Sequence, residues 1–130
     1  MSAVDEVLAQ ARASLDRVTP ADLADLPPDR LLVDIRPLHN RVAEGEIPGA
    51  VPIERVVLEW RLDPSGDHRI PGVTPDTTVV VFCNEGYSSS LAARDLQALG
   101  LPKATDLEGG FRGYRDAGLP VNEGGTQAIT

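Results

Sequence analysis

Short apolar runs and stretches with helical spacing alternate along this chain. Runs rich in β-branched residues occur at 31–35 and 79–82, and such runs are typical of strands that are buried on both faces of a sheet. A weaker pattern predicts a short strand at 104–107. Between these runs, apolar residues recur at steps of three and four, which is typical of amphipathic helices. The sequence predicts such helices at the N-terminus after the capping residue Ser2, after Thr19, and at 54–62, 88–99 and 111–117.

Strands that alternate with helices imply a mostly parallel sheet with helices on both faces. The segment 47–53 is also extended, but Pro48 and Pro52 suit an edge strand or a loop better than a central strand. We therefore predict a single α/β domain, since 130 residues are enough for one buried core. The core has to be mainly aliphatic, because aromatic residues make up only 4% of the chain. The helix at 54–62 is expected to contact it through Val57, Leu58 and Trp60.

The chain carries 20 acidic and 12 basic residues, a formal net charge of −8. This charge disfavours binding to nucleic acids and to anionic membrane surfaces. No apolar run approaches the length of a membrane span, and Asp5 and Glu6 argue against a signal peptide. The single cysteine excludes an internal disulfide and favours a reducing, cytoplasmic setting. The polar C-terminal residues 122–130 are expected to form a disordered tail.

The most informative stretch is the loop that follows the apolar run at 79–82. That run ends at Cys83, the six residues after it are polar or glycine, and a helix is predicted to begin at Ser88. Loops between a strand and a helix often form sites in open α/β sheets, and a helix N-terminus favours an anion or a thiolate. Gly86 permits a backbone conformation that most residues avoid. A lone cysteine at the end of a strand is also common as a small buried hydrophobe, so its position alone leaves both interpretations open.

Three parts of the chain resemble the single-domain rhodaneses, the sulfurtransferases that carry a persulfide on a cysteine. The loop fits the family pattern Cys-x-x-Gly-x-Arg/Ser-Ser/Thr. An upstream signature is similar, with Glu46 where histidine is common, and so is a closing signature, with Tyr114 where tryptophan is common. The upstream signature consists of residues 33–36 and 45–53, and the loop of residues 83–89. The closing signature consists of residues 107–114 and 117–121. The resemblance divides the chain into an N-terminal helical extension at 1–15, a rhodanese-like domain at 16–121 and a tail at 122–130.

The resemblance implies the rhodanese fold and a sulfurtransferase activity. Cys83 would accept a sulfane sulfur from a donor such as thiosulfate or a persulfide and pass it to a thiol or a cyanide-like acceptor, and a partner protein is a further candidate. No cofactor is implied, and His39 and His68 lack the spacing of a metal site. Asp34 is expected to orient Arg36 or backbone N–H groups. The expected substrate-binding loop, whose backbone N–H groups would hold the persulfide, consists of Asn84, Glu85, Gly86, Tyr87, Ser88 and Ser89.

Glu85 departs from the family, because many members carry a basic residue in this loop. A carboxylate beside the thiol would raise the pKa of the thiol and repel thiosulfate, which predicts low activity on that donor. Arg36, Arg55 and Arg61 are candidates to line the pocket mouth and compensate. One alternative is a non-catalytic rhodanese-like module that binds a partner or senses redox state. The other is the related phosphatase and arsenate-reductase group, whose loop is one residue longer and has arginine at the position of Ser89.

Overall fold

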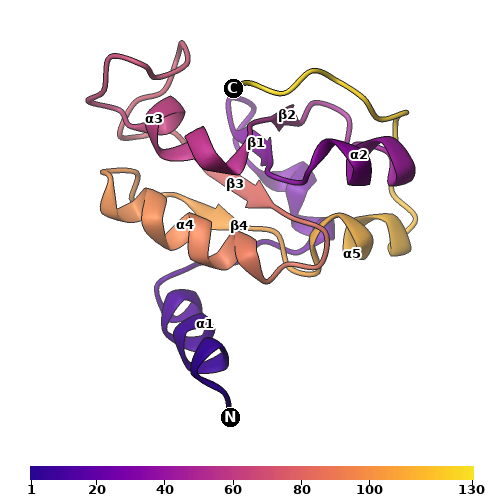
Figure 1. Cartoon of the computed structure of the whole chain (residues 1–130), viewed down its shortest axis with the longest axis horizontal. Helices are drawn as coiled ribbons and strands as arrows, with labels where there is room; N and C mark the ends of the chain where they lie inside the picture. Colours follow the sequence, from indigo (N-terminus) through magenta and orange to yellow (C-terminus); the bar gives the residue numbers. More distant parts are fainter.

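A four-stranded, all-parallel sheet forms the centre of the molecule (Figure 1). The computed structural model describes all 130 residues and has the strands β1 (Leu31–Asp34), β2 (Val51–Pro52), β3 (Val79–Phe82) and β4 (Thr105–Asp106). Their order in the sheet is β2-β1-β3-β4. In the central pair, Val33 of β1 lies beside Val81 of β3. The short strand β2, which contains Pro52, is at an edge, where a missing N–H is tolerated.

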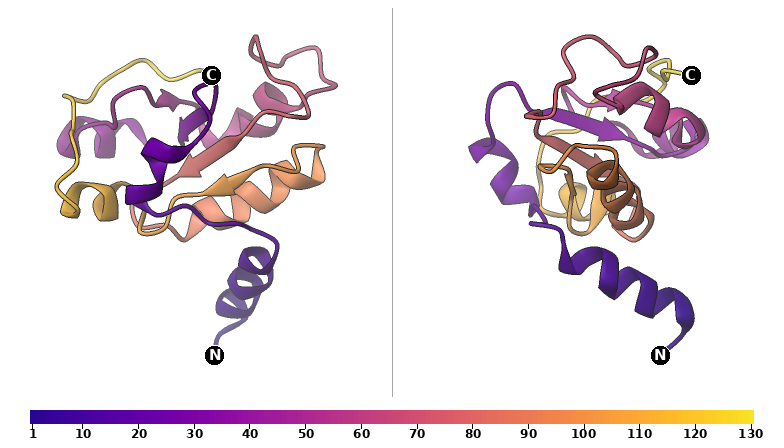
Figure 2. Two further views of the ribbon diagram at one scale, coloured as in Figure 1. Left: turned by 180° about the vertical axis from the view of Figure 1, so that it is seen from behind. Right: turned by 90° about the vertical axis from the view of Figure 1, so that its left-hand side faces the viewer.

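Helices cover both faces of the sheet, as the further views in Figure 2 show, and the predicted α/β fold is confirmed. The helix predicted to begin at Ser88 begins there, and Gly100, with φ of 106°, follows its end. No helix has both the length and the apolar composition needed to cross a membrane. The helices are α1 (Ala3–Ala13), the 3-10 helix η1 (Pro20–Asp25), α2 (Leu38–Glu44), the 3-10 helix η2 (Arg55–Val57), α3 (Leu58–Leu62), α4 (Ser88–Ala98) and α5 (Gly110–Asp116).

The core has two parts, one on each face of the sheet. Successive side chains of a strand point to opposite faces, so Val79 and Val81 of β3 enter one part while Val80 and Phe82 enter the other. All four side chains are fully buried, which explains the continuous apolar run in the sequence. The first part packs against α3 and α4 through Leu58, Leu62, Ala92 and Leu96, and the second against η1 and α5 through Leu23, Phe111 and Tyr114.

The helix expected at 54–62 is instead split into η2 and α3, and the expectation for Trp60 is wrong. Leu58 and Leu62 are fully buried, whereas Trp60 is 61% exposed. Residues four apart on a helix share a face, so placing Leu58 and Leu62 on the core directs Trp60, midway between them, away from it. Val57 packs at the margin of the core and is only partly buried.

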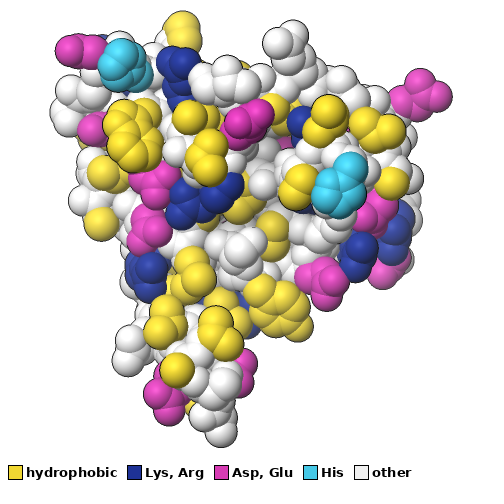
Figure 3. All heavy atoms as spheres, viewed as in Figure 1, with side chains coloured by type: hydrophobic (Ala, Val, Ile, Leu, Met, Phe, Trp, Pro, Cys, Tyr) yellow, Lys and Arg dark blue, Asp and Glu magenta, His cyan; other side chains and the backbone are white.

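Helix α1 projects from one side of the domain (Figure 2). Ser2 and Asp5 form a capping box at its start, as the capping role of Ser2 predicts. Only the end of the predicted apolar stripe is buried, with Ala11 inaccessible, whereas Val4 is 63% exposed. Several apolar side chains are visible on the projecting helix in Figure 3. Contact with the domain is thus concentrated near the C-terminal end of α1.

The C-terminal residues 122–130, for which the polar sequence predicts a tail, return along the β2 edge of the sheet. Asn122 and Glu46 exchange two backbone hydrogen bonds, and the N–H of Ile129 donates to the carbonyl of Pro52. The buried carboxylate of Glu46 accepts hydrogen bonds from the Thr126 hydroxyl at 2.6 Å and from the guanidinium of Arg41 at 2.8 Å. The open edge of the sheet and this buried carboxylate therefore supply the tail with partners that its composition does not reveal.

Candidate functional site

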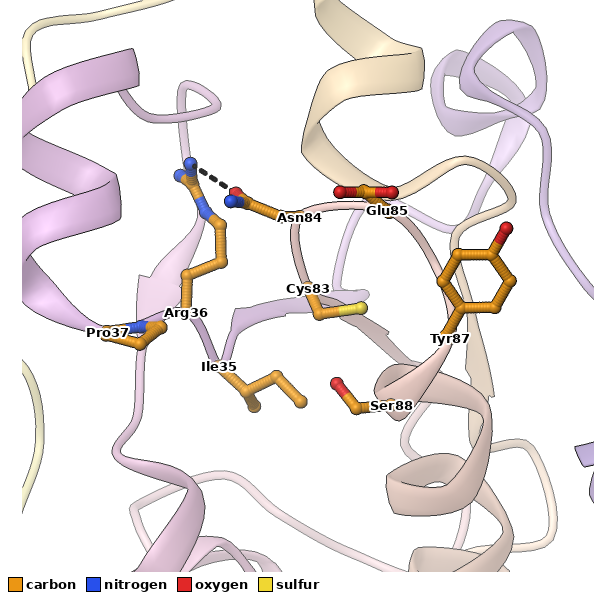
Figure 4. Close-up of a pocket in the computed structure, with 8 residues that line it drawn as sticks. All are labelled: Ile35, Arg36, Pro37, Cys83, Asn84, Glu85, Tyr87 and Ser88. Atoms are coloured by element: carbon orange, nitrogen blue, oxygen red, sulfur yellow. Dashed lines mark hydrogen bonds between the residues drawn. The ribbon is translucent and has the colours of Figure 1, made fainter. Parts of the chain in front are cut away.

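A pocket of about 380 Å³ lies at the carboxyl ends of β1 and β3 (Figure 4). In open α/β sheets ligands bind at this end of the strands. The Cys83 side chain is half-buried, and its sulfur points into the space beside Tyr87 and Ser88. The pocket is lined by Ile35, Arg36, Pro37, Cys83, Asn84, Glu85, Tyr87 and Ser88. Six of these were candidate site residues from the sequence, and the other candidates, Asp34, Gly86 and Ser89, are buried and do not line the pocket.

The start of α5 holds one side of the loop. The N–H of Phe111 donates to the carbonyl of Cys83 at 2.8 Å, and the N–H of Arg112 donates to the carbonyl of Asn84 at 3.0 Å. Only glycine fits at the contact, because a Cβ on Gly110 would lie 2.5 Å from the Cys83 carbonyl oxygen, and Gly110 also has φ of 61°. The closing sequence signature therefore lies against the loop and supports it.

The loop carbonyls and the loop N–H groups have different partners. The carbonyl of Gly86 accepts hydrogen bonds from Arg12 and Arg17, so three loop carbonyls are bound by groups outside the loop. No N–H between residues 84 and 89 donates to a backbone carbonyl. The N–H of Gly86 instead donates to the Cys83 sulfur at 3.2 Å. This division leaves donors available for a negatively charged group at the thiol.

The surroundings of Cys83 favour its thiolate. Burial by itself raises the pKa of the Cys83 thiol, but hydrogen bonds from Ser89 and Ser88 and from the backbone N–H groups of Ser89 and Gly86 outweigh it and lower the pKa below its ordinary value. The hydroxyl oxygen of Ser89, which has a single proton to donate, also lies 2.8 Å from a carboxylate oxygen of Asp106, which is the stronger acceptor. The Gly86 N–H, 3.2 Å from the sulfur, has no such competing acceptor.

We expect the alkylation rate of Cys83 to rise with pH along a curve whose midpoint lies below that of an ordinary cysteine thiol. The thiolate is the reacting form, so a lowered thiol pKa moves the rise to lower pH and leaves the rate flat above it. The measurement is the rate of iodoacetamide alkylation between pH 5 and pH 10, with free cysteine as reference. A midpoint at or above that of free cysteine would contradict the assigned donors.

Asp34 and Arg36 form a buried pair beneath the pocket. The carboxylate of Asp34 accepts hydrogen bonds from the Arg36 backbone N–H at 2.9 Å and from its Nη2 at 2.8 Å. The guanidinium also donates to the carbonyl of Gly45 and to the Asn84 side chain, and it lies 3.9 Å from the ring centroid of Phe111. Its donors are thus largely used within the protein. Arg36 lines the pocket, but its geometry supports positioning of Asn84 more than direct capture of an anion.

Glu85 does not face the thiol as an unpaired charge. Its carboxylate is exposed and accepts a hydrogen bond of 2.7 Å from Nη1 of Arg112 on α5. The same guanidinium donates to Glu44 of α2 at 3.0 Å. Hydrogen bonding by Arg112 is the main cause that lowers the pKa of the Glu44 carboxyl. Arg112 therefore partly neutralises the charge that the sequence places in the loop.

Comparison with known proteins decides the family. The model of the rhodanese-like domain matches residues 19–117, which is most of the chain and includes all the residues that line the pocket. The chain belongs to the rhodanese-like domain family. A sulfurtransferase from Allochromatium vinosum is 32% identical over 93 residues, covering 72% of this chain and 78% of that protein. Distant relatives of this rhodanese-like domain are thus named as sulfurtransferases.

Two further relatives of the rhodanese-like domain differ in length and in description. A Synechococcus elongatus protein with thiosulfate sulfurtransferase in its name is 30% identical over 132 residues, and the chain spans 41% of its length. A solved structure from Rhodopseudomonas palustris, a protein of unknown function described as a possible tyrosine phosphatase, superposes with a TM-score of 0.83. It is 33% identical, over 94% of this chain and 96% of that chain.

The rhodanese-like domain has a second group of loop contacts that the sequence did not single out. Asp106 of β4 is fully buried and accepts hydrogen bonds from the hydroxyls of Ser89 and Ser90 at 2.8 and 2.7 Å. Its other oxygen accepts from Nε of Arg17 at 2.8 Å. The position of Asp106 at the end of the strand next to β3 is the one sequence signal for these contacts, because strand ends in a parallel sheet meet at the same edge.

Two of the arginines expected at the pocket mouth lie elsewhere. Arg55 pairs with Glu59 and Asp95, and Arg61 donates to the carbonyls of His68 and Thr130. The expectation that they line the pocket is therefore wrong. Both belong to the η2–α3 segment, whose predicted continuous helix is broken in the structure.

Proposed function

We propose that the protein is a sulfurtransferase that carries a sulfane sulfur as a persulfide on Cys83. The observation that carries the proposal is the thiol itself, whose pKa is lowered in a loop that presents free backbone N–H groups and whose Gly86 N–H already donates to the sulfur. A persulfide anion needs the same donors as a thiolate, one atom further into the pocket. The names of several relatives agree with this activity.

The reaction divides into two balanced steps. In the first, the Cys83 thiolate attacks the outer sulfur of thiosulfate; a sulfur–sulfur bond forms on the enzyme, the bond within thiosulfate breaks, and sulfite leaves with the electron pair. In the second, an acceptor such as cyanide attacks the outer sulfur of the persulfide, thiocyanate forms, and the thiolate returns. Neither step needs a proton from the protein. The contribution of the protein is to lower the pKa of the nucleophile and to stabilise negative charge on sulfur.

The same pocket is poorly suited to phosphate ester hydrolysis, although one similar structure is described as a possible tyrosine phosphatase. In the phosphatases with this fold an arginine six positions after the cysteine binds the oxyanion, and here that position is Ser89, whose hydroxyl donates to Asp106. No residue from 84 to 90 is basic. Arg36 lines the pocket but is hydrogen-bonded to Asp34. These features favour a single sulfur atom over a tetrahedral dianion.

The proposal is tested by assaying two reactions on one preparation. Thiosulfate and cyanide should yield thiocyanate in a catalytic, protein-dependent manner, while an aryl phosphate should be hydrolysed no faster than by the alkylated protein. Hydrolysis of the aryl phosphate at ordinary enzyme rates, with no thiocyanate formed, would favour the phosphatase instead. Failure of both reactions with several sulfane donors would favour a non-catalytic rhodanese-like module.

Charges at the pocket rim are expected to tune activity on thiosulfate. Glu85→Gln should raise the second-order rate with this dianion about two- to five-fold, because it leaves Nη1 of Arg112 free at the rim. Arg112→Gln should lower the rate by a similar factor, since Glu44 and Glu85 then lose their shared cation. Both effects should shrink at high salt.

The matched control for the rim charges is Asp76→Asn, which removes one negative charge near the opposite end of β3. Its rate should equal that of the wild type at every ionic strength. Equal rates for Glu85→Gln and Asp76→Asn would show that the carboxylate of Glu85 does not act on the incoming donor.

A further inference from the structure

Two arginines from the N-terminal segment meet at one carbonyl of the thiol loop. Nη2 of Arg12, in α1, donates to the carbonyl oxygen of Gly86 at 2.7 Å, and Nη2 of Arg17 donates to the same oxygen at 3.1 Å. Nε of Arg12 also donates to the hydroxyl of Ser90 at 3.1 Å, and its guanidinium lies 5.7 Å from the Tyr87 ring centroid. The matched family segment begins at residue 19, so both arginines lie outside it.

Both guanidinium groups are held firmly. Arg12 precedes the end of α1, and the neighbouring Ala11 is fully buried where the helix meets the domain. Arg17 is fixed on its other side by the buried carboxylate of Asp106, with Nε 2.8 Å from Oδ1. Since Asp106 also binds Ser89 and Ser90, Arg17 and the start of α4 are parts of one hydrogen-bonded cluster. Two rigid cations therefore converge on the outer side of the loop.

Because the peptide bond is planar, the hydrogen bonds of the two arginines to the Gly86 carbonyl also fix the direction of the N–H in the same peptide. The Gly86–Tyr87 bond is trans, as are all peptide bonds in the structure, so its C=O and its N–H point in opposite directions. The carbonyl faces the two arginines, and the N–H of Tyr87 consequently points away from them. That N–H donates to no backbone carbonyl, and Tyr87 lines the pocket beside Cys83. Gly86 has φ of 87°, a conformation that other residues rarely adopt and that glycine permits.

We propose that Arg12 and Arg17 are positioning residues that hold the Gly86–Tyr87 peptide with its carbonyl on the outer side of the loop, and so fix the turn in which the Gly86 N–H donates to the Cys83 sulfur. A carbonyl bound by two guanidinium groups is polarised, and this strengthens the N–H of the same peptide as a donor. The helix α1 is then part of the site. The effect on the thiolate is independent of the reaction, whereas the same effect on the persulfide rests on the proposed sulfurtransferase function.

The test is the pH dependence of iodoacetamide alkylation in Arg12→Gln, which removes both of the Arg12 hydrogen bonds to the loop region. We expect the midpoint to rise by about half a pKa unit to one unit, which is about a three- to ten-fold loss of thiolate near neutral pH. The matched control is Arg94→Gln on α4, because Arg94 is also a single cation but pairs only with Asp95. Its midpoint should remain that of the wild type.

Measuring the midpoint shift at high salt distinguishes the loss of an oriented hydrogen-bond donor from the loss of a charge. The shift in Arg12→Gln should persist in 1 M salt, where the screening length is about 3 Å. A shift that disappears in 1 M salt, or no shift at all, would overturn the proposal. Arg12→Lys keeps a cation, with its donors on a single nitrogen, and should recover part of the wild-type midpoint; it also serves as the test if Arg12→Gln unfolds. An unshifted midpoint in Arg12→Lys alone, with Arg12→Gln unfolded, would count against the proposal.

Alkylation needs no sulfur donor, so its result does not depend on whether the protein is a sulfurtransferase. A wild-type protein that forms no thiocyanate but shows the expected shift in Arg12→Gln would retain the positioning role and lose the sulfurtransferase assignment. An active wild type with an unshifted variant would retain the activity and lose the positioning role.

Discussion

Replacing Cys83 with serine is expected to abolish sulfur transfer, with thiocyanate formation lowered at least about a thousand-fold. A serine hydroxyl does not ionise near neutral pH, and an oxygen at this position cannot carry a persulfide. The side chains are nearly isosteric, and Cys83 is only half-buried in a polar loop, so the fold should be nearly unchanged. The measurement is thiocyanate production beside thermal unfolding of both proteins.

Alkylated wild-type protein is the control for a structural effect of Cys83→Ser. Wild-type protein alkylated on its single cysteine should lose activity to the same extent as Cys83→Ser, although its backbone is unaltered. A serine variant that kept most of the activity while remaining folded would show that Cys83 is not the nucleophile.

Replacing Asp106 with asparagine is expected to lower the free energy of unfolding by about 3–5 kcal/mol. The carboxylate is inaccessible to solvent and accepts hydrogen bonds from Arg17, Ser89 and Ser90. An amide of the same size leaves Arg17 without its counterion and turns one acceptor into a donor that faces other donors. The measurement is urea unfolding at neutral pH, followed by circular dichroism.

Asp95→Asn is the matched control for Asp106→Asn. Asp95 also pairs with arginines, Arg55 and Arg94, but its side chain is 38% exposed. Exposed ion pairs contribute little, so the loss of stability should stay below about 1 kcal/mol. Equal losses for the two variants would mean that the buried cluster at Asp106 contributes no more than a surface pair. A loss confined to Asp106→Asn would confirm that the loop is anchored through β4.

The parts of the site that could be predicted from sequence are those encoded locally. The apolar run of β3, the change to polar residues at Cys83 and the helix start at Ser88 are neighbours in the chain, so periodicity and turn residues describe them directly. Asp34 next to Arg36 is also local, and the expected contact between them is present. The sheet followed from the alternation of strands and helices, because only a few arrangements bury both of its faces.

The parts that could not be predicted depend on contacts between distant segments. Arg12 and Arg17 reach Gly86 across about half of the chain, and Arg112 approaches Glu85 only because α5 begins beside the loop. No periodicity marks such residues, since each is an ordinary charged residue in its own segment. The error for Trp60 has a similar origin, because the rotation of a short helix about its axis is set by packing and not by composition.

The central claim, that Cys83 carries a sulfane sulfur, is tested most directly by mass spectrometry of the protein after incubation with thiosulfate that has a heavy isotope in its outer sulfur. We expect the intact mass to increase by one heavy sulfur atom and the peptide containing Cys83 to carry it, and we expect cyanide to remove it as labelled thiocyanate. A protein that stays unmodified with thiosulfate and with an organic persulfide, while its thiol remains open to alkylation, would contradict the account.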